Sequence, residues 1–198
     1  TELRAYLKSD DFIIIPLGRK DEGLSTDGKP KGRNIQDGNR VGLSGHIHSH
    51  THTRGELGGI QDKRHGMSVC HQNKTPIITI KYDVSKAHRR TAIPDKDRKY
   101  MVVQLTDEQG NPEYWVNLVH TYGVASAQHY WGRTAACFVR LQYYLSDEVQ
   151  YVYVFVDDYS LLVTLNNPMA LAAHILLFVE TYGLPIAYHK IYINYDET

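Results

Sequence analysis

Three aspartates directly follow apolar, β-branched stretches of the sequence. Asp83 follows residues 77–82 (Ile-Ile-Thr-Ile-Lys-Tyr), and the pair Asp157-Asp158 follows residues 151–156 (Tyr-Val-Tyr-Val-Phe-Val). Such stretches are typical of buried strands. Like charges about 4 Å apart repel by roughly 1 kcal/mol in water and about 4 kcal/mol at an effective dielectric of 20. A divalent cation removes this cost, and Mg²⁺ prefers carboxylate and phosphate oxygens, so the pattern favours a phosphoryl-transfer site. For Asp157-Asp158 alone, the alternative is a solvated hairpin turn.

The elements expected around these aspartates form an α+β fold. Strands are predicted for residues 77–82, 151–156, 159–165 and 187–193, a hairpin for 100–104 with 114–119, and helices for 126–144 and 168–181. Apolar residues at three- and four-residue spacing indicate the first helix, and Pro168 and Gly183 bracket the second. Residues 21–66 are rich in Gly, Lys, Arg, Asn and His, so they are predicted to form hairpins and loops. The expected fold is an antiparallel sheet with helices packed on one face.

The charge of the 198-residue chain is unevenly distributed, although the net charge is zero. Residues 1–100 contain 19 Lys and Arg against 12 Asp and Glu, whereas residues 101–198 contain 3 against 10. This asymmetry predicts one lobe that meets a polyanion and one that holds metal-binding carboxylates. Two solvated surfaces of opposite sign would give the same counts.

Compartment and chain context can also be predicted from composition. No run of about 18 apolar residues and no signal peptide is found, so no membrane association is expected. Cys70 and Cys137 are isolated thiols, which are typical of a reducing intracellular compartment, cytoplasm or nucleus. Because the sequence begins with Thr rather than Met, we expect it to be part of a longer chain or polyprotein.

Four stretches occur in a fixed order along the second part of the chain. They are Lys81-Tyr82-Asp83-Val84-Ser85-Lys86-Ala87-His88, Tyr122-Gly123-Val124-Ala125-Ser126-Ala127-Gln128-His129-Tyr130-Trp131, Phe155-Val156-Asp157-Asp158 and Tyr182-Gly183-Leu184-Pro185-Ile186-Ala187-Tyr188-His189-Lys190. In this order they resemble motifs A, B, C and D of reverse transcriptases of the retrotransposon kind. Upstream, Lys31-Gly32-Arg33-Asn34-Ile35-Gln36-Asp37 resembles the fingers pattern of these enzymes, in which a basic pair precedes an aliphatic-x-Asp.

The sequence departs from the family's motifs at four positions. The gate residue after motif A is His88 rather than Phe or Tyr, and Gln128 replaces the Pro of motif B. Motif C begins with Phe155 rather than Tyr and has Val156 before the aspartate pair. None of these departures removes a carboxylate. No primer grip or thumb is recognised after Ile193, so we expect that the chain holds primer and template poorly by itself.

The resemblance implies a partial fingers region over residues 1–75, basic in charge, and a polymerase palm over residues 76–198. The implied activity is template-directed nucleotidyl transfer, as in an RNA-directed DNA polymerase of a mobile element. Its implied partners are an RNA or DNA template with a primer and deoxynucleoside triphosphates. The implied cofactor is a pair of Mg²⁺ ions, with Mn²⁺ as a substitute, held by Asp83, Asp157 and Asp158.

The resemblance also implies roles for residues around the carboxylates. Lys190 is expected to donate a proton or charge to the leaving group, and His88 to act as the sugar gate. The remaining nucleotide-binding residues implied by the motifs are Lys31 and Arg33 at the triphosphate, and Gly123, Ser126 and Gln128 along the template and nucleotide pocket.

Several alternatives remain open at the level of sequence. The chain could be a catalytically inactive, polymerase-like module that binds nucleic acid. Lys31, Arg33 and Lys190 could be ordinary solvated charges. The histidines at positions 46, 48, 50 and 52 would lie on one face of a strand, where two could share a metal ion, or they could form an exposed strand or loop.

Overall fold

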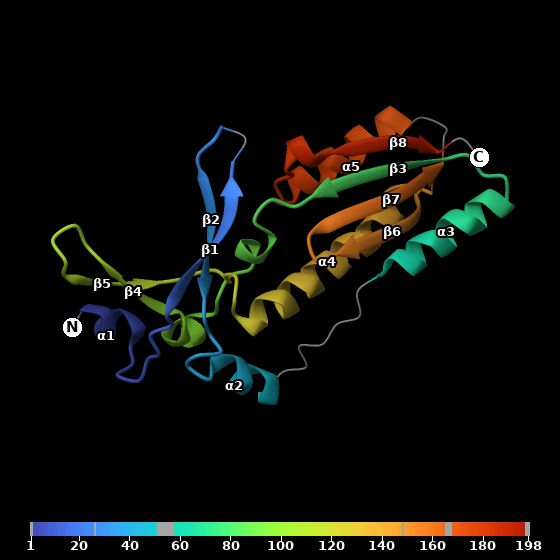
Figure 1. Cartoon of the computed structure of the whole chain (residues 1–198). Helices are drawn as coiled ribbons and strands as arrows, with labels where there is room; N and C mark the ends of the chain where they lie inside the picture. Colours follow the sequence, from blue (N-terminus) through green and yellow to red (C-terminus); the bar gives the residue numbers. More distant parts are fainter. Residues whose placement is uncertain (1, 26, 51–57, 148, 165–167, 197–198) are drawn as a thin grey trace. The chain divides into compact units, whose positions relative to one another are not determined.

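The chain has an α+β fold whose named strands pair antiparallel in three separate sheets (Figure 1). A computed structural model describes residues 2–25, 27–50, 58–147, 149–164 and 168–196. The chain divides into two compact units that are interleaved in the sequence. The first unit comprises residues 1–54 and 88–130, and the second comprises residues 55–87 and 131–198. Within the described ranges, no helix has the length and apolarity needed to cross a membrane.

The second unit is built on a four-stranded antiparallel sheet with the strand order β6-β7-β3-β8. These strands are β3 (Ile77–Asp83), β6 (Val149–Phe155), β7 (Asp158–Thr164) and β8 (Tyr192–Asp196). β3 is inside the sheet, paired on both edges. Its first four residues, 77–80, are all buried. From residue 78 on, apolar and polar residues alternate along the strand, so that Thr79, Lys81 and Asp83 share the face opposite Ile78, Ile80 and Tyr82.

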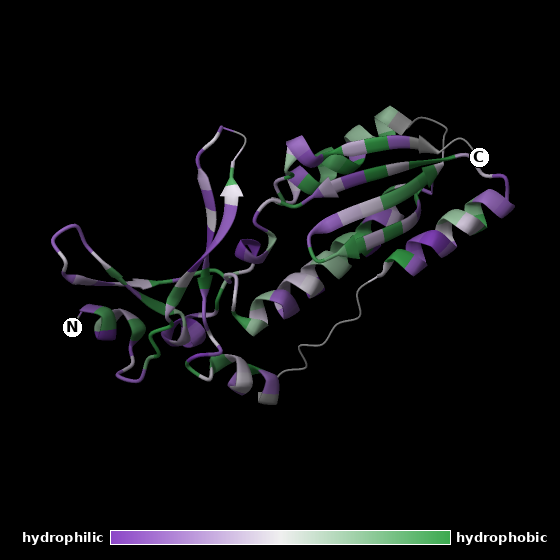
Figure 2. Ribbon diagram, viewed as in Figure 1, coloured by the Kyte–Doolittle hydropathy of each residue, from purple (hydrophilic) through white to green (hydrophobic). Residues whose placement is uncertain are grey.

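Helices cover both faces of this sheet. On one face, α4 (Ala125–Leu145) and α5 (Pro168–Thr181) pack on the alternate residues Ile78, Ile80 and Tyr82 of β3. Figure 2 shows α5 mostly in the green of hydrophobic residues, whereas α3 mixes green with purple. On the other face, α3 (Ile60–Gln72) contributes Cys70 to a smaller cluster with Ile77 and Leu162. The expectation of helices on one face is therefore corrected by α3.

The first half of α3, up to Gly66, was expected to be a loop because of its composition. Gly66 lies in the middle of α3, where glycine costs about 1 kcal/mol relative to alanine. In the structure a Cβ at Gly66 would come within 2.0 Å of the Tyr153 hydroxyl. The glycine therefore permits the close approach of α3 to β6, and local propensity is overridden by tertiary packing.

The first unit has a small core and two separate hairpins. The hairpins are β1 (Leu17–Leu24) with β2 (Pro30–Gln36) and β4 (Val102–Thr106) with β5 (Pro112–Val116). Two helices, α1 (Glu2–Leu7) and α2 (Leu43–His50), complete the unit together with 3-10 helices at Ala87–Arg90, which begins at the end of the second unit, and Asp95–Tyr100. The buried core is formed by Ile15, Leu43, Ile93, Met101 and Val124.

Two further expectations from the sequence are corrected. His46 and His48 lie in α2, a helix rather than a strand or loop, so histidines at alternate positions do not share one face as they would on a strand. His50 ends the same helix, whereas His52 lies outside the described residues. The last strand begins at Tyr192 rather than at residue 187, because a 3-10 helix over Tyr188–Lys190 precedes it.

Candidate active site

Asp83 and Asp158 lie opposite each other on neighbouring strands. Asp83 ends β3, Asp158 begins β7, and the two are direct partners in the antiparallel ladder, where paired Cα atoms are about 4.5–5.5 Å apart. Asp157 precedes Asp158 in the tight turn after β6, and its carbonyl oxygen accepts a 3.1 Å hydrogen bond from the Val84 amide. The structure thus brings the three predicted aspartates together at one end of the sheet; we call them the carboxylate cluster.

The turn that carries Asp157 has an unusual backbone conformation. Val156 has a φ of +60°, a left-handed conformation that a β-branched residue rarely adopts. The fully buried Trp131 of α4 donates a 2.6 Å hydrogen bond from its indole Nε1 to the Val156 carbonyl oxygen. The core therefore holds the turn in a strained form. Such strain persists where the surrounding structure enforces it, and it is concentrated at functional sites.

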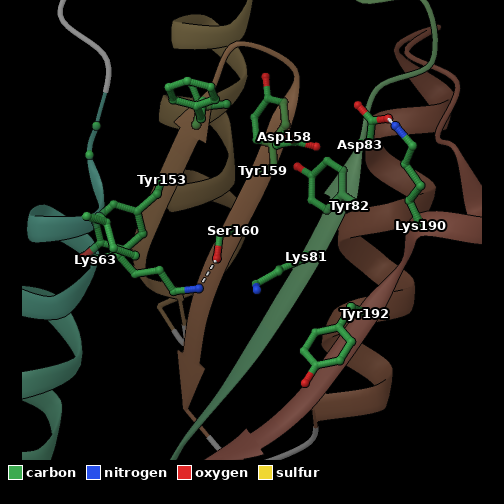
Figure 3. Close-up of a pocket in the computed structure, with 15 residues that line it drawn as sticks. Lys63, Lys81, Tyr82, Asp83, Tyr153, Asp158, Tyr159, Ser160, Lys190 and Tyr192 are labelled. Atoms are coloured by element: carbon green, nitrogen blue, oxygen red, sulfur yellow. Dashed lines mark hydrogen bonds and ion pairs between the residues drawn. The ribbon is translucent and has the colours of Figure 1, made fainter. Parts of the chain in front are cut away.

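Lys190 is positioned by backbone contacts between its own segment and the end of β3. The Ser85 amide donates to the Pro185 carbonyl (2.8 Å), and the Ala187 amide donates to the Asp83 carbonyl (2.9 Å). A single turn of 3-10 helix then directs Lys190 towards the sheet, where its Nζ donates to Oδ2 of Asp83 (Figure 3). The predicted catalytic lysine is therefore in contact with a predicted metal ligand.

The carboxylate cluster has more negative charge than the single ammonium group of Lys190 can balance. Asp83 is only 6% exposed, and its Oδ1 is buried without a hydrogen-bond partner. Burial, followed by repulsion from the Asp83 carboxylate, raises the pKa of Asp157. The hydrogen bond to Asp83 raises the pKa of Lys190, which strengthens the protonated, positively charged form.

The carboxylate cluster suits a hard divalent cation. Mg²⁺ takes carboxylate oxygens as ligands, and the unpaired Oδ1 of Asp83 is an acceptor that such an ion would satisfy. In the described part of the chain, no three His, Cys, Asp or Glu side chains are arranged as a ready-made metal cage. Instead, the lysine occupies one oxygen of Asp83. The pair of Mg²⁺ ions stays a prediction.

A cavity of about 590 Å³ opens on the same face of the sheet as Asp83 and Asp158 (Figure 3). Two further lysines line this cavity. Lys81 lies over the ring of Tyr192, 5.2 Å from its centroid, and Lys63 of α3 donates a 2.9 Å hydrogen bond from its Nζ to the Ser160 hydroxyl. Sequence reasoning missed both lysines. Strand alternation could have identified Lys81, because it lies two residues before Asp83 and shares its face.

In the first unit, the two candidate triphosphate-binding cations share one carboxylate. Arg33 forms a 2.9 Å ion pair with Oε1 of Glu22, and Lys31 forms a 3.6 Å pair with Oε2 of the same residue. The guanidinium of Arg33 also lies 4.5 Å from the centroid of the Tyr122 ring. Glu22 could not be found from the sequence, because its reach depends on an irregularity in the β1–β2 register between Asp21 and Leu24.

His88 contacts the same tyrosine. Its ring meets Tyr122 edge-on, with the centroids 5.3 Å apart, and both of its ring nitrogens are buried without a hydrogen-bond partner. Burial, then the neighbouring His120 and Arg33, lower the pKa of His88, which favours a neutral imidazole. The structure thus groups Arg33 and His88 around Tyr122; we call these three residues the Tyr122 cluster.

The other motif B residues lie near this cluster but have different surroundings. Gly123 has a φ of +90°, and a Cβ there would come within 2.0 Å of the Gln36 carbonyl oxygen, so glycine is required by both backbone conformation and space. Ser126 lines a small cavity of about 190 Å³ within the first unit. Gln128 is exposed on the first turn of α4.

Comparisons with known proteins do not assign this chain to a family. No protein-family model matches the sequence, and no curated protein matches it at a significant level. Functional inference therefore depends on the residues themselves and on the geometry described above.

Proposed function

We propose that this chain is a template-directed nucleotidyl transferase, a reverse-transcriptase-like polymerase of a mobile element, whose second unit is the palm. The observation that carries the proposal is the direct pairing of Asp83 with Asp158, beside Asp157 in a strained turn, at one end of an antiparallel sheet. The helices α4 and α5 support this end of the sheet from behind. The order of the four motifs in the sequence supports the same reading.

The chemistry of the carboxylate cluster is consistent with phosphoryl transfer. When bound, divalent cations would activate the primer hydroxyl and stabilise the charge that develops on the transferred phosphate. Asp83, Asp157 and Asp158 would hold these ions by their carboxylate oxygens. Lys190, half exposed and next to Asp83, would stabilise the leaving pyrophosphate or give it a proton.

The remaining groups would bind the substrates. The cavity beside Asp83 and Asp158, with Lys81 and Lys63 on its walls, would accept the sugar–phosphate backbone at the primer end. Within the first unit, Lys31 and Arg33 would bind a triphosphate, and His88, held against Tyr122, would contact the sugar of a nucleotide. Removal of the His88 ring should then change the preference for deoxyribose over ribose.

The decisive experiment is primer extension by the chain with Mg²⁺, compared between wild type and Asp157→Asn. We expect the variant to lose at least about 10³-fold in rate, because it lacks a carboxylate that stabilises the transition state. Without metal its thermal midpoint should be unchanged or higher, since a repulsion that roughly equals 1–4 kcal/mol per close pair is relieved.

The matched control is Asp147→Asn, which removes an exposed aspartate of the same unit and should leave the rate unchanged. Extension by Asp157→Asn at the wild-type rate would refute the proposed site. A wild-type chain that binds primer–template but never extends it would instead identify an inactive, polymerase-like binding module.

A further inference from the structure

The ammonium group of Lys190 contacts a carboxylate that the proposed function assigns to a divalent cation. Nζ of Lys190 donates to Oδ2 of Asp83, and the two side chains differ in burial, at 54% and 8% exposed. A lysine ammonium and a metal ion repel each other and compete for the same oxygen. The two cations therefore cannot both occupy Oδ2 of Asp83.

We propose that Lys190 is a built-in counter-ion that exchanges with the divalent cation. Without metal it neutralises Asp83, and when a divalent ion binds, the ammonium group leaves Asp83 and enters the adjacent cavity. This inference rests on the proposed function for the use of the metal. The exchange itself depends only on the lysine and the carboxylate cluster.

The structure separates a fixed part of Lys190 from a part that can move. The backbone before it is joined to the end of β3 by the hydrogen bonds of Ser85 and Ala187. The side chain, in contrast, is a flexible four-carbon stem that is half exposed and lines the cavity of about 590 Å³ together with Asp83 and Asp158. Thus the ammonium can swing away while its attachment point stays beside the site.

The two carboxylate oxygens of Asp83 differ in their accessibility to an incoming ion. Its Oδ1 is buried and has no hydrogen-bond partner, whereas Oδ2 is taken by the lysine. Because Oδ1 is shielded from solvent, the first oxygen of Asp83 that an incoming divalent ion can reach is Oδ2, from which it must displace the ammonium. Because binding linkage is reciprocal, the lysine lowers the metal affinity by the same factor by which the metal weakens the ion pair.

One consequence is a fixed order of events at the site. The lysine that would assist the leaving phosphate is released from Asp83 only after metal has entered, so its charge becomes available when a metal-bound phosphate is present to receive it. In the metal-free protein, the positive charge of Lys190 reduces the repulsion between the three carboxylates of the cluster.

The test measures Mn²⁺ affinity of the whole chain by electron paramagnetic resonance of the free ion. Lys190→Met should bind Mn²⁺ about tenfold more tightly than wild type, a factor within the usual range of coupling between two ligands. The charge-matched control is Lys81→Met, because Lys81 lies on the same face of the sheet and over Tyr192. Its affinity should change by less than about threefold, as expected for a more distant charge.

A double-mutant cycle identifies the partner. In an Asp83→Asn background, Lys190→Met should no longer increase the Mn²⁺ affinity. The exchange is overturned if Lys190→Met does not increase the Mn²⁺ affinity, or if Lys81→Met increases it equally. It is also overturned if Lys190→Met still increases the affinity in the Asp83→Asn background. Failure of wild type and Lys190→Met to bind Mn²⁺ at millimolar concentration would overturn it as well.

These outcomes are separate from the test of the proposed function. If the chain extends a primer and needs Asp157 but Lys190→Met leaves Mn²⁺ affinity unchanged, the polymerase proposal survives and the exchange fails. If no primer is extended but Lys190→Met binds Mn²⁺ more tightly in a manner that needs Asp83, the exchange stands and the proposed activity fails.

Discussion

The two units hold their candidate functional groups in opposite ways. In the second unit, the carboxylate cluster lies at the ends of strands whose face towards α4 and α5 contributes to the larger buried core, and Asp83 is itself buried. In the first unit, Lys31 and Arg33 lie on a two-stranded hairpin with side chains 58% and 45% exposed. Metal ligands need fixed positions, whereas cations that attract a polyanion gain from remaining solvated. The difference suggests that the second unit holds the metal ligands rigidly, whereas the first unit attracts the polyanion.

A buried tryptophan should show how much the second unit depends on its core. Trp131→Ala should lower the free energy of unfolding by about 3–5 kcal/mol, because it removes a fully buried ring and the hydrogen bond to the Val156 carbonyl. Urea denaturation measures the loss, and hydrogen exchange assigns it to a unit. The matched control is Trp115→Ala, which removes a 56% exposed tryptophan of the first unit and should cost less than about 1 kcal/mol. If both substitutions lowered the free energy of unfolding equally, the two units would not differ in how strongly they depend on a buried core.

A substitution at Gly123 tests whether the first unit also contains a backbone segment that cannot rearrange. Gly123→Ala should cost at least about 2 kcal/mol, because its left-handed backbone and the nearby Gln36 carbonyl leave no space for a Cβ. Gly132→Ala is the control: this exposed position in α4 has open space for a Cβ, so alanine should stabilise the helix by about 0.5–1 kcal/mol. A neutral Gly123→Ala would show that the junction of motif B with β2 is not rigid.

Stability of the first unit should depend on pH through its buried histidines. Burial is the main cause that lowers the pKa of His88, with contributions from His120 and Arg33. Burial also lowers the pKa of His120, against smaller opposite effects of the hydrogen bond to the Thr91 backbone and of Asp97. Because the pKa is lower in the folded state, the histidines of the unfolded chain bind protons at a higher pH than those of the folded chain. The free energy of unfolding therefore has its full value above pH about 6.5 and decreases as the pH falls below it.

Hydrogen exchange at pH 7 and pH 5 measures this loss within the first unit. The variant His88→Gln with His120→Gln should have a flatter pH dependence than wild type. A first unit that becomes more stable on acidification would contradict the burial of neutral imidazoles described above.

The smallest expected effect concerns Glu22. Glu22→Gln should tighten binding of metal-free tripolyphosphate by a few-fold, because it frees Lys31 and Arg33 from a shared anion and exposed pairs are worth about 0.2–1 kcal/mol. Isothermal titration at low salt is suited to this measurement. Glu108→Gln, at an exposed site in the other hairpin, is the control. Weaker binding by Glu22→Gln would show that Glu22 positions the two cations rather than competing for them.

The sequence was sufficient for the elements with a strong local signal. β3, the β6–β7 hairpin, α4 and α5 lie where apolar runs and helical spacing predicted them. The approach of Asp83 to Asp157 and Asp158 could also be anticipated, because each follows such a run. Here local propensity, hydrophobic pattern and the final packing agree.

Other features depend on tertiary contacts that no local pattern contains. The first half of α3 was missed because it belongs to a segment rich in Gly, Lys, Arg, Asn and His, and the packing of Tyr153 against Gly66 cannot be seen in the sequence. Glu22 becomes a partner of Arg33 only through the register of the hairpin. The 3-10 helix before β8 forms because the segment is hydrogen-bonded to the end of β3, a strand more than a hundred residues earlier.

The position of β3 inside the second sheet also has a consequence for synthesis. Its buried residues 77–80 pair with β7 and β8, which the ribosome makes later, at roughly 5–20 residues per second. For several seconds both edges of this β-branched strand lack their partners, which is a condition that favours pairing with other chains. Efficient production of this protein should therefore depend on slow, cool expression or on a chaperone that shields the nascent strand until its neighbours arrive.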